Sequence, residues 1–405
     1  MIFITFGSHP AISLAECASL FPKEIRPETA TEHGCFVDLP ESEALNVMNR
    51  VAMSIKVVGK ISEPFPKDQL LDQLKKYVID NTEKERIIFG SSVYNAGNNK
   101  LTDSLERQMP RTCLSLKKQL KESGTMVRVV SGKLPRLSSV QVETNHLLDR
   151  GAEIVMLATP KGVRLGVTLG VQNFKSWSKR DFGRPARDAK SGMLPPKVAR
   201  MLVNLTGADP KTDTVFDPFC GSGTVLMEAA VMGFTRLLGS DISEKATGDT
   251  EANFAWLKTH WPNMYFPDLL TIDAGQLPND FKNRFNTIAG EVYLGTPQSK
   301  RPPTKQAEHQ ARELMVDYKR IFRHLFDLAR PGTHFVVAFP AFSTQEEPVF
   351  LPLKEMLSEI GFIIDNPLPE TTPEKLKQLS PSGGLIYKRP TQFVWRDIMV
   401  FQKPE

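Results

Sequence analysis

From residue 215 onward, short apolar runs alternate with longer segments whose apolar residues recur at helical spacing. The runs have the length of buried strands, and the segments between them are long enough for helices that cross from one strand to the next. This order predicts a Rossmann-like α/β domain with seven strands in its sheet. The strands are expected to end near residues 216, 241, 273 and 291, with two more at 333–342 and 390–403, the last as an edge hairpin strand.

The ends of the expected helices are marked by their sequences. A helix follows Gly223 directly, Ser243 has the side chain of an N-cap for a helix that runs through Trp256, and segment 308–332 has helical spacing and stops at Pro331–Gly332.

The first half of the chain follows a different order. Residues 1–60 combine short apolar runs with a helical segment at 11–21, which predicts a small ferredoxin-like α+β region. Residues 61–175 are expected to continue with helices near 64–78 and 104–124, strands at 86–95 and 126–132, and then a helix, a strand, a turn and a strand. Residues 176–405 form the third part, a linker and the Rossmann-like domain.

Composition sets limits on the kind of protein. The 405 residues are 40% hydrophobic and 24% charged, which is typical of a folded protein of two or three domains. The four cysteines form no CxxC pair and have no histidines at metal-ligand spacing, so we expect no disulfide, no metal and a cytoplasmic location. The first residues lack the basic start of a signal peptide, and no membrane association is expected.

The chain is weakly basic, with 51 Lys and Arg against 46 Asp and Glu. Its cations gather in segments 114–136, 174–190 and 297–306, and aromatic residues interrupt the second of these. Phosphate contact together with base stacking is one interpretation, and three solvated loops are the other. The candidate RNA contacts are Lys117, Lys118, Arg128, Lys133, Arg136, Arg180 and Arg184. For the last two, pairing inside the protein is the alternative.

The most informative stretch is VFDPFCGSGTVLMEAA at 215–230, in which a strand meets a glycine-rich turn and then a helix. Gly221 and Gly223 allow positive φ angles and a close approach of the ligand to the backbone. The stretch matches neither GxGxxG nor GxxxxGK[ST], so a dinucleotide or a nucleoside triphosphate fits poorly. An amino acid fits better, because Asp217 could bind its ammonium group and the amides at the helix start its carboxylate.

Each of the next three expected strands also ends in an acid. Asp241 follows the glycines by about twenty residues, where an acid accepts hydrogen bonds from ribose hydroxyls. Asp273 is placed to accept from an adenine amino group, and Glu291 ends the fourth strand together with Tyr293. The carboxyl ends of the strands share one edge of such a sheet, so these acids are expected around one crevice. An amino acid, a ribose and an adenine together describe S-adenosylmethionine.

At these residues the chain resembles the THUMP-containing tRNA guanine-N2 methyltransferases. The resemblance rests on DPFCGSGT with LMEA, on GMLPPKVARMLVNL and SWSKRDFGRPARD upstream, and on IYKRPTQFVWRDIMVF near the C-terminus. It covers roughly residues 120–405. It implies a methyltransferase that uses S-adenosylmethionine to modify N2 of a guanosine in tRNA, in the region of position 10. It also implies that residues 61–175 form a THUMP-like RNA-binding domain, although a generic α/β scaffold fits their pattern too.

The resemblance assigns roles to single residues. Asp217, Gly221, Gly223 and Thr224 would hold the methionine end, Asp241 the ribose, and Asp273 with Ala274 the adenine, while Met193 and Leu194 would flank the cofactor. Phe219 and Ile242 complete the expected cofactor site. Some members of the family use a small activating partner, which we keep as a possibility.

The fourth strand departs from the family pattern. Related amino-methyltransferases have Asp or Asn followed by Pro-Pro-Tyr there, and this chain has Glu-Val-Tyr-Leu. Glu291 keeps an acceptor for the target amine and Tyr293 keeps an aromatic ring, so we predict that these two residues are catalytic. The alternatives are an amine of ribosomal RNA or DNA as the target, or a protein that binds RNA without catalysis.

Overall fold

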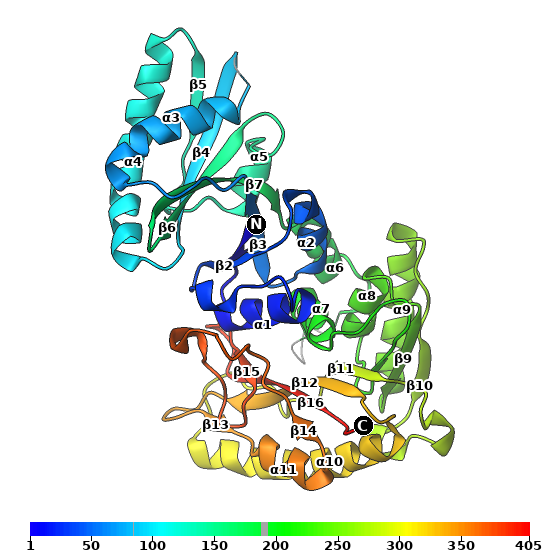
Figure 1. Ribbon diagram of the computed structural model, residues 1–405. Helices are drawn as coiled ribbons and strands as arrows, with labels where there is room; N and C mark the ends of the chain where they lie inside the picture. The colour runs from blue at the N-terminus through cyan, green and yellow to red at the C-terminus, as the bar shows by residue number, and fades with distance from the viewer. Residues whose placement is uncertain (84, 188–192) are drawn as a thin grey trace. The chain divides into compact units, whose positions relative to one another are not determined.

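The computed structural model describes residues 1–83, 85–187 and 193–405. Asp188 and Gly192, which belong to the two upstream family motifs, lie outside these residues. The chain divides into two compact units, which Figure 1 shows with their elements labelled. Unit 1 comprises Met1–Phe174 and Pro369–Lys377, and unit 2 comprises Lys175–Leu368 and Gln378–Glu405.

Unit 1 is built on one mixed seven-stranded sheet of order β2-β1-β3-β7-β6-β4-β5. Its strands are β1 (Ile2–Phe6), β2 (Gly34–Val37), β3 (Ser54–Gly59), β4 (Arg86–Asn95), β5 (Met126–Val130), β6 (Ala152–Thr159) and β7 (Gly162–Val171). Its helices are α1 (Pro10–Leu20), α2 (Ala44–Arg50), α3 (Leu70–Asp80), α4 (Asn99–Glu122) and α5 (Ser139–Thr144). Residues 1–60 and 61–175, which the sequence pattern separates, share this sheet because β3 pairs with β7.

Different helices cover the two faces of the sheet in unit 1, because successive side chains of a strand point to opposite faces. In α3 the buried residues Leu70, Leu74 and Val78 recur every four positions, so that one stripe of the helix faces the sheet. Ile87 of β4 lies in the same cluster as α3 and α4, whereas the next residue, Ile88, packs with Val142 of α5. Helices α3 and α5 therefore cover opposite faces of the sheet.

Unit 2 contains a nine-stranded sheet whose main path is β10-β9-β8-β11-β12-β16-β14. Its strands are β8 (Thr214–Asp217), β9 (Arg236–Asp241), β10 (Asp268–Thr271), β11 (Thr287–Glu291), β12 (His334–Phe342), β13 (Val349–Phe350), β14 (Ile363–Ile364), β15 (Leu385–Tyr387) and β16 (Val394–Gln402). Its helices are α6 (Phe174–Phe182), which starts at the unit boundary, α7 (Pro196–Leu205), α8 (Thr224–Val231), α9 (Glu244–His260), α10 (Thr304–Leu328) and α11 (Leu353–Ile360).

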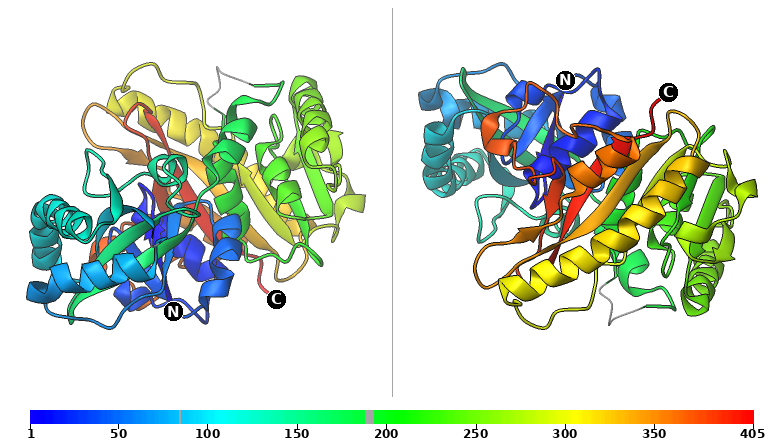
Figure 2. Two further views of the ribbon diagram at one scale, coloured as in Figure 1. Left: turned by 90° about the horizontal axis from the view of Figure 1, so that it is seen from above. Right: turned by 90° about the horizontal axis from the view of Figure 1, so that it is seen from below.

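The first five strands of the path are parallel, so β8, β9, β10 and β11 end at one edge of the sheet. Helices α7, α8 and α9 lie over one face, and α10 and α11 lie over the other, as the two views of Figure 2 show. The seven strands of the main path and the two covering layers confirm the predicted Rossmann-like α/β fold. The two further strands, β13 and β15, are short additions that pair with β12 and β16.

Two expectations about elements need correction. Segment 390–403 contains β16, which lies between β12 and β14 and is not an edge strand. Its nine residues pair along the whole of β12, from His334 opposite Gln402 to Phe342 opposite Val394. Helix α9 also continues four residues beyond Trp256, to His260, while Ser243 caps it as expected by accepting from the Ala246 amide.

Candidate active site

The carboxyl ends of the parallel strands in unit 2 surround a cavity of about 710 Å³. All but one of the residues predicted to bind cofactor or to act in catalysis lie on its wall. Those on the wall are Met193, Asp217, Phe219, Gly221, Thr224, Asp241, Ile242, Asp273, Ala274, Glu291 and Tyr293. Leu194, which was expected to flank the cofactor, lines the cavity too. The exception, Gly223, is the residue before α8.

The glycine turn has a backbone conformation that favours glycine. Gly221 and Gly223 have φ angles of 54° and 80°, which residues with a side chain rarely adopt. At Gly223 a Cβ atom would also stand only 2.7 Å from the Thr250 side chain. Helix α9 holds the turn, because Thr250 Oγ1 donates to the Gly221 carbonyl over 2.8 Å and Asn253 Nδ2 donates to the Ser222 carbonyl over 2.8 Å. Sequence reasoning missed these two positions, although a buried Thr and Asn one turn apart in a helix were a usable signal.

Asp241 joins the glycine turn to the next loop. Its Oδ2 accepts from the Gly221 amide and its Oδ1 accepts from the Ser243 amide, each over 2.9 Å. A carboxylate oxygen has two lone pairs, so each oxygen can accept one more hydrogen bond from a ligand. Next to it, the Ile242 side chain is 74% exposed and supplies an apolar surface at the cavity.

Asp217 is the most buried acid of the site, at 2% exposure. Its Oδ1 accepts from the Phe219 amide over 3.1 Å. Burial raises the pKa of this carboxyl well above its usual range, and the nearby Asp241 and Glu291 carboxylates raise it further, while the Phe219 amide acts in the other direction. Among the residues that the structure describes, no cation acts on this carboxyl, and the ammonium group of a ligand would supply one.

Asp273 forms an ion pair with Arg320 of α10. Burial alone would raise the pKa of its carboxyl, but the hydrogen bonds from Arg320 of α10 and the Gly275 amide outweigh that effect, so that the pKa is lowered. Arg320 Nη2 lies 2.8 Å from Oδ2, and the Gly275 amide lies 2.7 Å from Oδ1. Arg320 itself lines the cavity, and this position of α10 could not be predicted from the sequence.

Glu291, at the end of β11, forms a two-point ion pair with Arg396 of β16. Arg396 Nε donates to Oε2, and Nη2 donates to Oε1 over 3.3 Å. Arg396 is 2% exposed, and the Glu291 side chain is 15% exposed toward the cavity. Burial raises the pKa of the Glu291 carboxyl, and Arg396 lowers it again in part. The predicted acceptor is therefore present, and its position is fixed by a residue that sequence reasoning missed.

Tyr293 follows Glu291 on the rim of the cavity, with 65% of its surface exposed. Its backbone carbonyl accepts a hydrogen bond of 2.5 Å from the hydroxyl of the buried Tyr318 of α10. The loop after β11 is thus anchored to α10 through its backbone. The aromatic ring remains free to contact a flat ligand such as a nucleobase.

The structure contradicts the prediction that Arg180 and Arg184 contact RNA, because each is only 3% exposed. Arg180 Nε donates to Glu228 of α8 over 2.5 Å, and its guanidinium lies 4.4 Å from the centre of the Trp177 ring. Arg184 Nη1 donates to Thr224 Oγ1 over 2.6 Å. Both arginines support α8 from inside unit 2. Pairing inside the protein, the alternative considered from the sequence, is what the structure shows.

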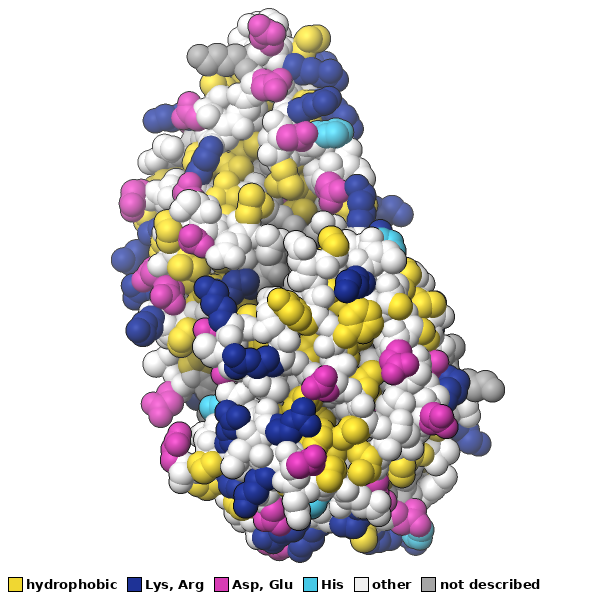
Figure 3. Space-filling model, turned by 90° about the vertical axis from the view of Figure 1, so that its right-hand side faces the viewer, with side chains coloured by type: hydrophobic (Ala, Val, Ile, Leu, Met, Phe, Trp, Pro, Cys, Tyr) yellow, Lys and Arg dark blue, Asp and Glu magenta, His cyan; other side chains and the backbone are white. Residues whose placement is uncertain are grey.

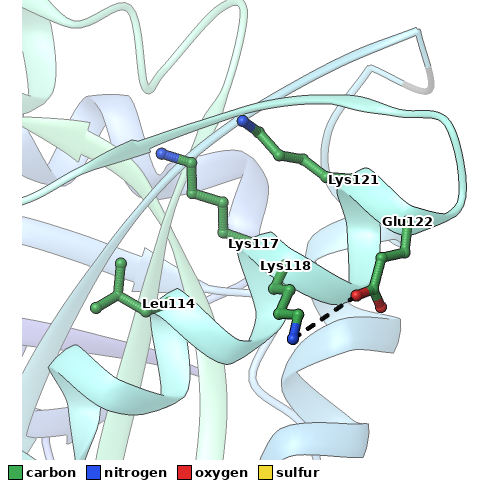
Figure 4. A pocket seen from close by; sticks show the side chains of 5 residues that line it. All are labelled: Leu114, Lys117, Lys118, Lys121 and Glu122. Carbon is green, nitrogen blue, oxygen red and sulfur yellow. Dashed lines mark ion pairs between the residues drawn. The ribbon is translucent and has the colours of Figure 1, made fainter.

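Four of the other predicted RNA contacts are accessible. Lys118, Arg128 and Lys133 are exposed, and Lys117 is half-buried. In α4, Lys117, Lys118 and Lys121 surround a shallow surface pocket together with Leu114 and Glu122. Figure 4 shows the ammonium groups of Lys117 and Lys121 pointing away from the helix, whereas that of Lys118 pairs with Glu122 over 3.9 Å. Lys121, one turn after Lys117, was not among the predicted contacts. Arg136 is half-buried and pairs with Glu106 over 3.1 Å.

Cations are not confined to one area. On the face of the molecule in Figure 3, Lys and Arg side chains alternate with acidic and apolar ones. Within the described ranges there is no cluster of three His, Cys, Asp or Glu side chains suited to a metal ion. Nor does any helix described have the length and apolar character needed to span a lipid bilayer.

Part of unit 2 is similar in sequence to known methyltransferases. Residues 184–260 match the family described as RMKL-like, methyltransferase domain. Over 75 residues the chain is 44% identical to a tRNA (guanine(10)-N2)-dimethyltransferase of Methanothermobacter thermautotrophicus, and over 78 residues it is 38% identical to the protein of that name from Pyrococcus abyssi. These alignments cover 18% and 19% of this chain and 20% and 21% of the relatives. The matches confirm the resemblance to the tRNA guanine-N2 methyltransferases, over about a fifth of the length of those relatives.

The fold has a wider match. The crystal structure of TrmN from Thermus thermophilus aligns over 100% of both chains with a TM-score of 0.53 at 17% identity. SMU.472, solved with SAH bound, aligns over 100% of this chain and 98% of its own with a TM-score of 0.50 at 11% identity. At such identities the likeness concerns the fold alone, and it extends over unit 1 as well as unit 2.

Proposed function

We propose that this protein is an S-adenosylmethionine-dependent methyltransferase that modifies N2 of a guanosine in tRNA. The observation that carries the proposal is the gathering of Asp217, Asp241, Asp273 and Glu291 around one cavity beside the glycine turn. The two relatives that align over 75 and 78 residues are named for this reaction at guanosine 10 of tRNA, which favours the same region of the substrate.

The residues of the cavity suit this cofactor. Asp217 would pair with the ammonium group of its methionine part, and the amides at the start of α8, beside Gly223 and Thr224, would bind the carboxylate. The spare lone pairs of Asp241 would accept from the ribose hydroxyls, and Ile242 would cover the adenine. Asp273, already bonded to Arg320, has lone pairs left for the adenine amino group, next to Ala274. Met193 and Phe219 would enclose the ligand.

The cofactor supplies an electrophilic methyl group on a sulfonium sulfur, so the protein has to position the target nitrogen. Glu291 accepts a hydrogen bond from the target amine, and this turns the nitrogen lone pair toward the methyl group. Tyr293 stacks on the base. The amine releases its proton after the carbon–nitrogen bond has formed, so no strong base is required. The ion pair with Arg396 keeps an acceptor on the cavity wall despite the loss of the usual prolines, which favours an enzyme over a protein that only binds RNA.

We assign RNA binding to unit 1. The order of elements in residues 61–175 is the one expected of a THUMP-like region, and Lys117, Lys118, Arg128 and Lys133 are accessible to phosphates. A small activating subunit is a further possibility that the family resemblance brings with it.

The direct test is incubation of the purified protein with radiolabelled S-adenosylmethionine and unmodified bulk tRNA, followed by nucleoside analysis. Labelled N2-methylguanosine, or its dimethylated form, is the expected product. Label in N6-methyladenosine instead would assign another target amine. Cofactor binding without label in any nucleoside would contradict the proposed reaction for the protein acting alone.

A further inference from the structure

The ion pair between Glu291 and Arg396 gives the cavity a carboxylate that is fixed at both oxygens. Arg396 contacts both Oε1 and Oε2, and Gln392 Oε1 accepts from Arg396 Nη1 over 3.3 Å on the other side. A guanidinium and a carboxylate that meet at two points define a plane, so the carboxylate can turn little. Arg396 occupies the edge of the carboxylate at which the lone pairs of the two oxygens converge, and the remaining lone pairs point away from each other. Because Glu291 lines the cavity and Arg396 does not, a ligand meets the outward lone pair of one oxygen.

An ionised carboxylate accepts hydrogen bonds and cannot donate them. This property distinguishes guanine from adenine and cytosine, the other bases that carry an exocyclic amine. In guanine the N2 amine stands next to N1–H, so two donors point in one direction. In adenine the N6 amine stands next to N1, and in cytosine the N4 amine stands next to N3, and both ring nitrogens are acceptors whose lone pairs would face the carboxylate oxygens.

We propose that Glu291, held by Arg396, is the residue that selects guanine, with the outward lone pair of one carboxylate oxygen accepting from both N2–H and N1–H. The inference rests on the proposed function and adds to it the determinant of base specificity. Glu291 is thereby both a catalytic and a specificity residue. Arg396 is a positioning residue, since it acts on the base through Glu291.

A buried cluster of three charged residues elsewhere in unit 2 has a purely structural role. Glu228 accepts from both Arg180 and Arg200 and is 1% exposed, and none of these side chains lines the cavity. The Glu291–Arg396 pair differs because its acid is open to the cavity, at the point where the target base would lie.

The base 2,6-diaminopurine provides the test, because it keeps the N2 amine of guanine but has an acceptor at N1. Two tRNA substrates are assembled by ligation, one with guanosine and one with diaminopurine at the methylated position, each opposite its pairing partner. We expect the wild-type protein to methylate guanosine with a kcat/KM about 10- to 100-fold higher, the value of one hydrogen bond to a charged group. Equal kcat/KM values for the two RNAs would overturn the proposal.

Two substitutions trace this preference to the ion pair. In Glu291→Gln the amide can donate to N1 of diaminopurine, so the ratio of the two kcat/KM values should fall toward one. In Arg396→Met the carboxylate loses its fixed plane, and the ratio should fall as well, with partial rescue in Arg396→Lys. Since each comparison is a ratio within one variant, a general loss of activity does not affect it. A variant Glu291→Gln that kept the wild-type ratio would refute the specificity role.

The control is Arg389→Met, which removes an exposed arginine close to Arg396 in the chain and should leave the ratio unchanged. Binding of SAH, measured by calorimetry, distinguishes a failure of the proposed function from a failure of the specificity role of Glu291. If the wild-type protein binds no SAH and methylates neither RNA, the proposed function fails. If it methylates guanosine but does not discriminate against diaminopurine, only the present inference fails.

Discussion

The burial of Asp217 has a consequence for its proposed role in cofactor binding. Its carboxyl has few partners and a raised pKa in the ligand-free protein, whereas the ammonium group of the cofactor would favour the ionised form. Binding should therefore release a proton wherever the pH lies below the raised pKa. In that range the affinity for SAH should increase with pH, by at most tenfold per unit.

Calorimetry in two buffers of different ionisation enthalpy measures this proton release directly. In Asp217→Asn the side chain has the same shape but cannot ionise, so that both the proton release and this pH dependence should disappear. An affinity of the wild-type protein that is the same across the acidic and neutral range would show that Asp217 does not pair with the ammonium group.

Asp397 provides a prediction about stability at the residue scale. It is fully buried next to Arg396 in β16, and burial raises the pKa of its carboxyl to about 7, although the Ser380 hydroxyl acts against this. Because the pKa in the folded state is above that in the unfolded state, the neutral form favours folding below about pH 4. This stabilisation is lost as the pH rises toward 7.

Replacement by the neutral Asn should therefore raise the free energy of unfolding at pH 8 relative to the wild type, by about 1 to 3 kcal/mol, and should have little effect at pH 4. Urea unfolding at the two pH values tests this. Asp365→Asn, a change at a less buried acid of the same unit, is the matched control and should have a smaller effect. A loss of stability in Asp397→Asn at pH 8 would contradict the prediction.

At the scale of elements, α8 depends on the turn that precedes it. Gly223 has a positive φ angle, and a Cβ atom there would collide with Thr250 of α9. Gly223→Val should displace the turn from α9 and reduce SAH affinity by about tenfold or more, since strain and steric overlap each cost on the order of 1 kcal/mol. Gly233→Val, at a glycine with positive φ but open space around it, controls for the strain alone. Equal effects of the two changes on SAH binding would mean that the contact with Thr250 is irrelevant to the site.

The sequence predicted those parts of the site that depend on neighbouring residues. The strand, the glycines and the helix from 215 to 230 form a local pattern, and the acids at Asp241 and Glu291 end strands that could be recognised one at a time. Arg396 could not be found in this way, because it reaches Glu291 across 105 positions of sequence through the pairing of β12 with β16. Arg320 and Tyr318 reach the cavity from α10, whose packing face is set by the tertiary structure. Arg180 and Arg184 were misassigned because a basic segment looks the same whether it is solvated or buried.

At the scale of the whole molecule, the proposal divides the work between the units, with RNA binding in unit 1 and cofactor binding in unit 2. The net charge of +5 is too small to hold a tRNA by itself, so local clusters must supply the attraction. Lys117 and Lys118, beside Lys121 on α4, are the strongest candidates. Each phosphate contact that is lost should reduce the dependence of log K on log salt concentration by about 1.

The double variant Lys117→Gln/Lys118→Gln should therefore weaken tRNA binding and lower the salt slope by about 2, while SAH affinity remains that of the wild type. The matched control is Lys75→Gln/Lys76→Gln, which removes the same charge from α3 of the same unit and is expected to change the slope less. Binding isotherms at several salt concentrations measure both effects. A loss of tRNA affinity with an unchanged slope would point to altered packing of α4, because only contacts with phosphates release counterions. An unchanged affinity would move the RNA site away from α4, toward Arg128 and Lys133 at the edge strand β5 and the loop that follows it.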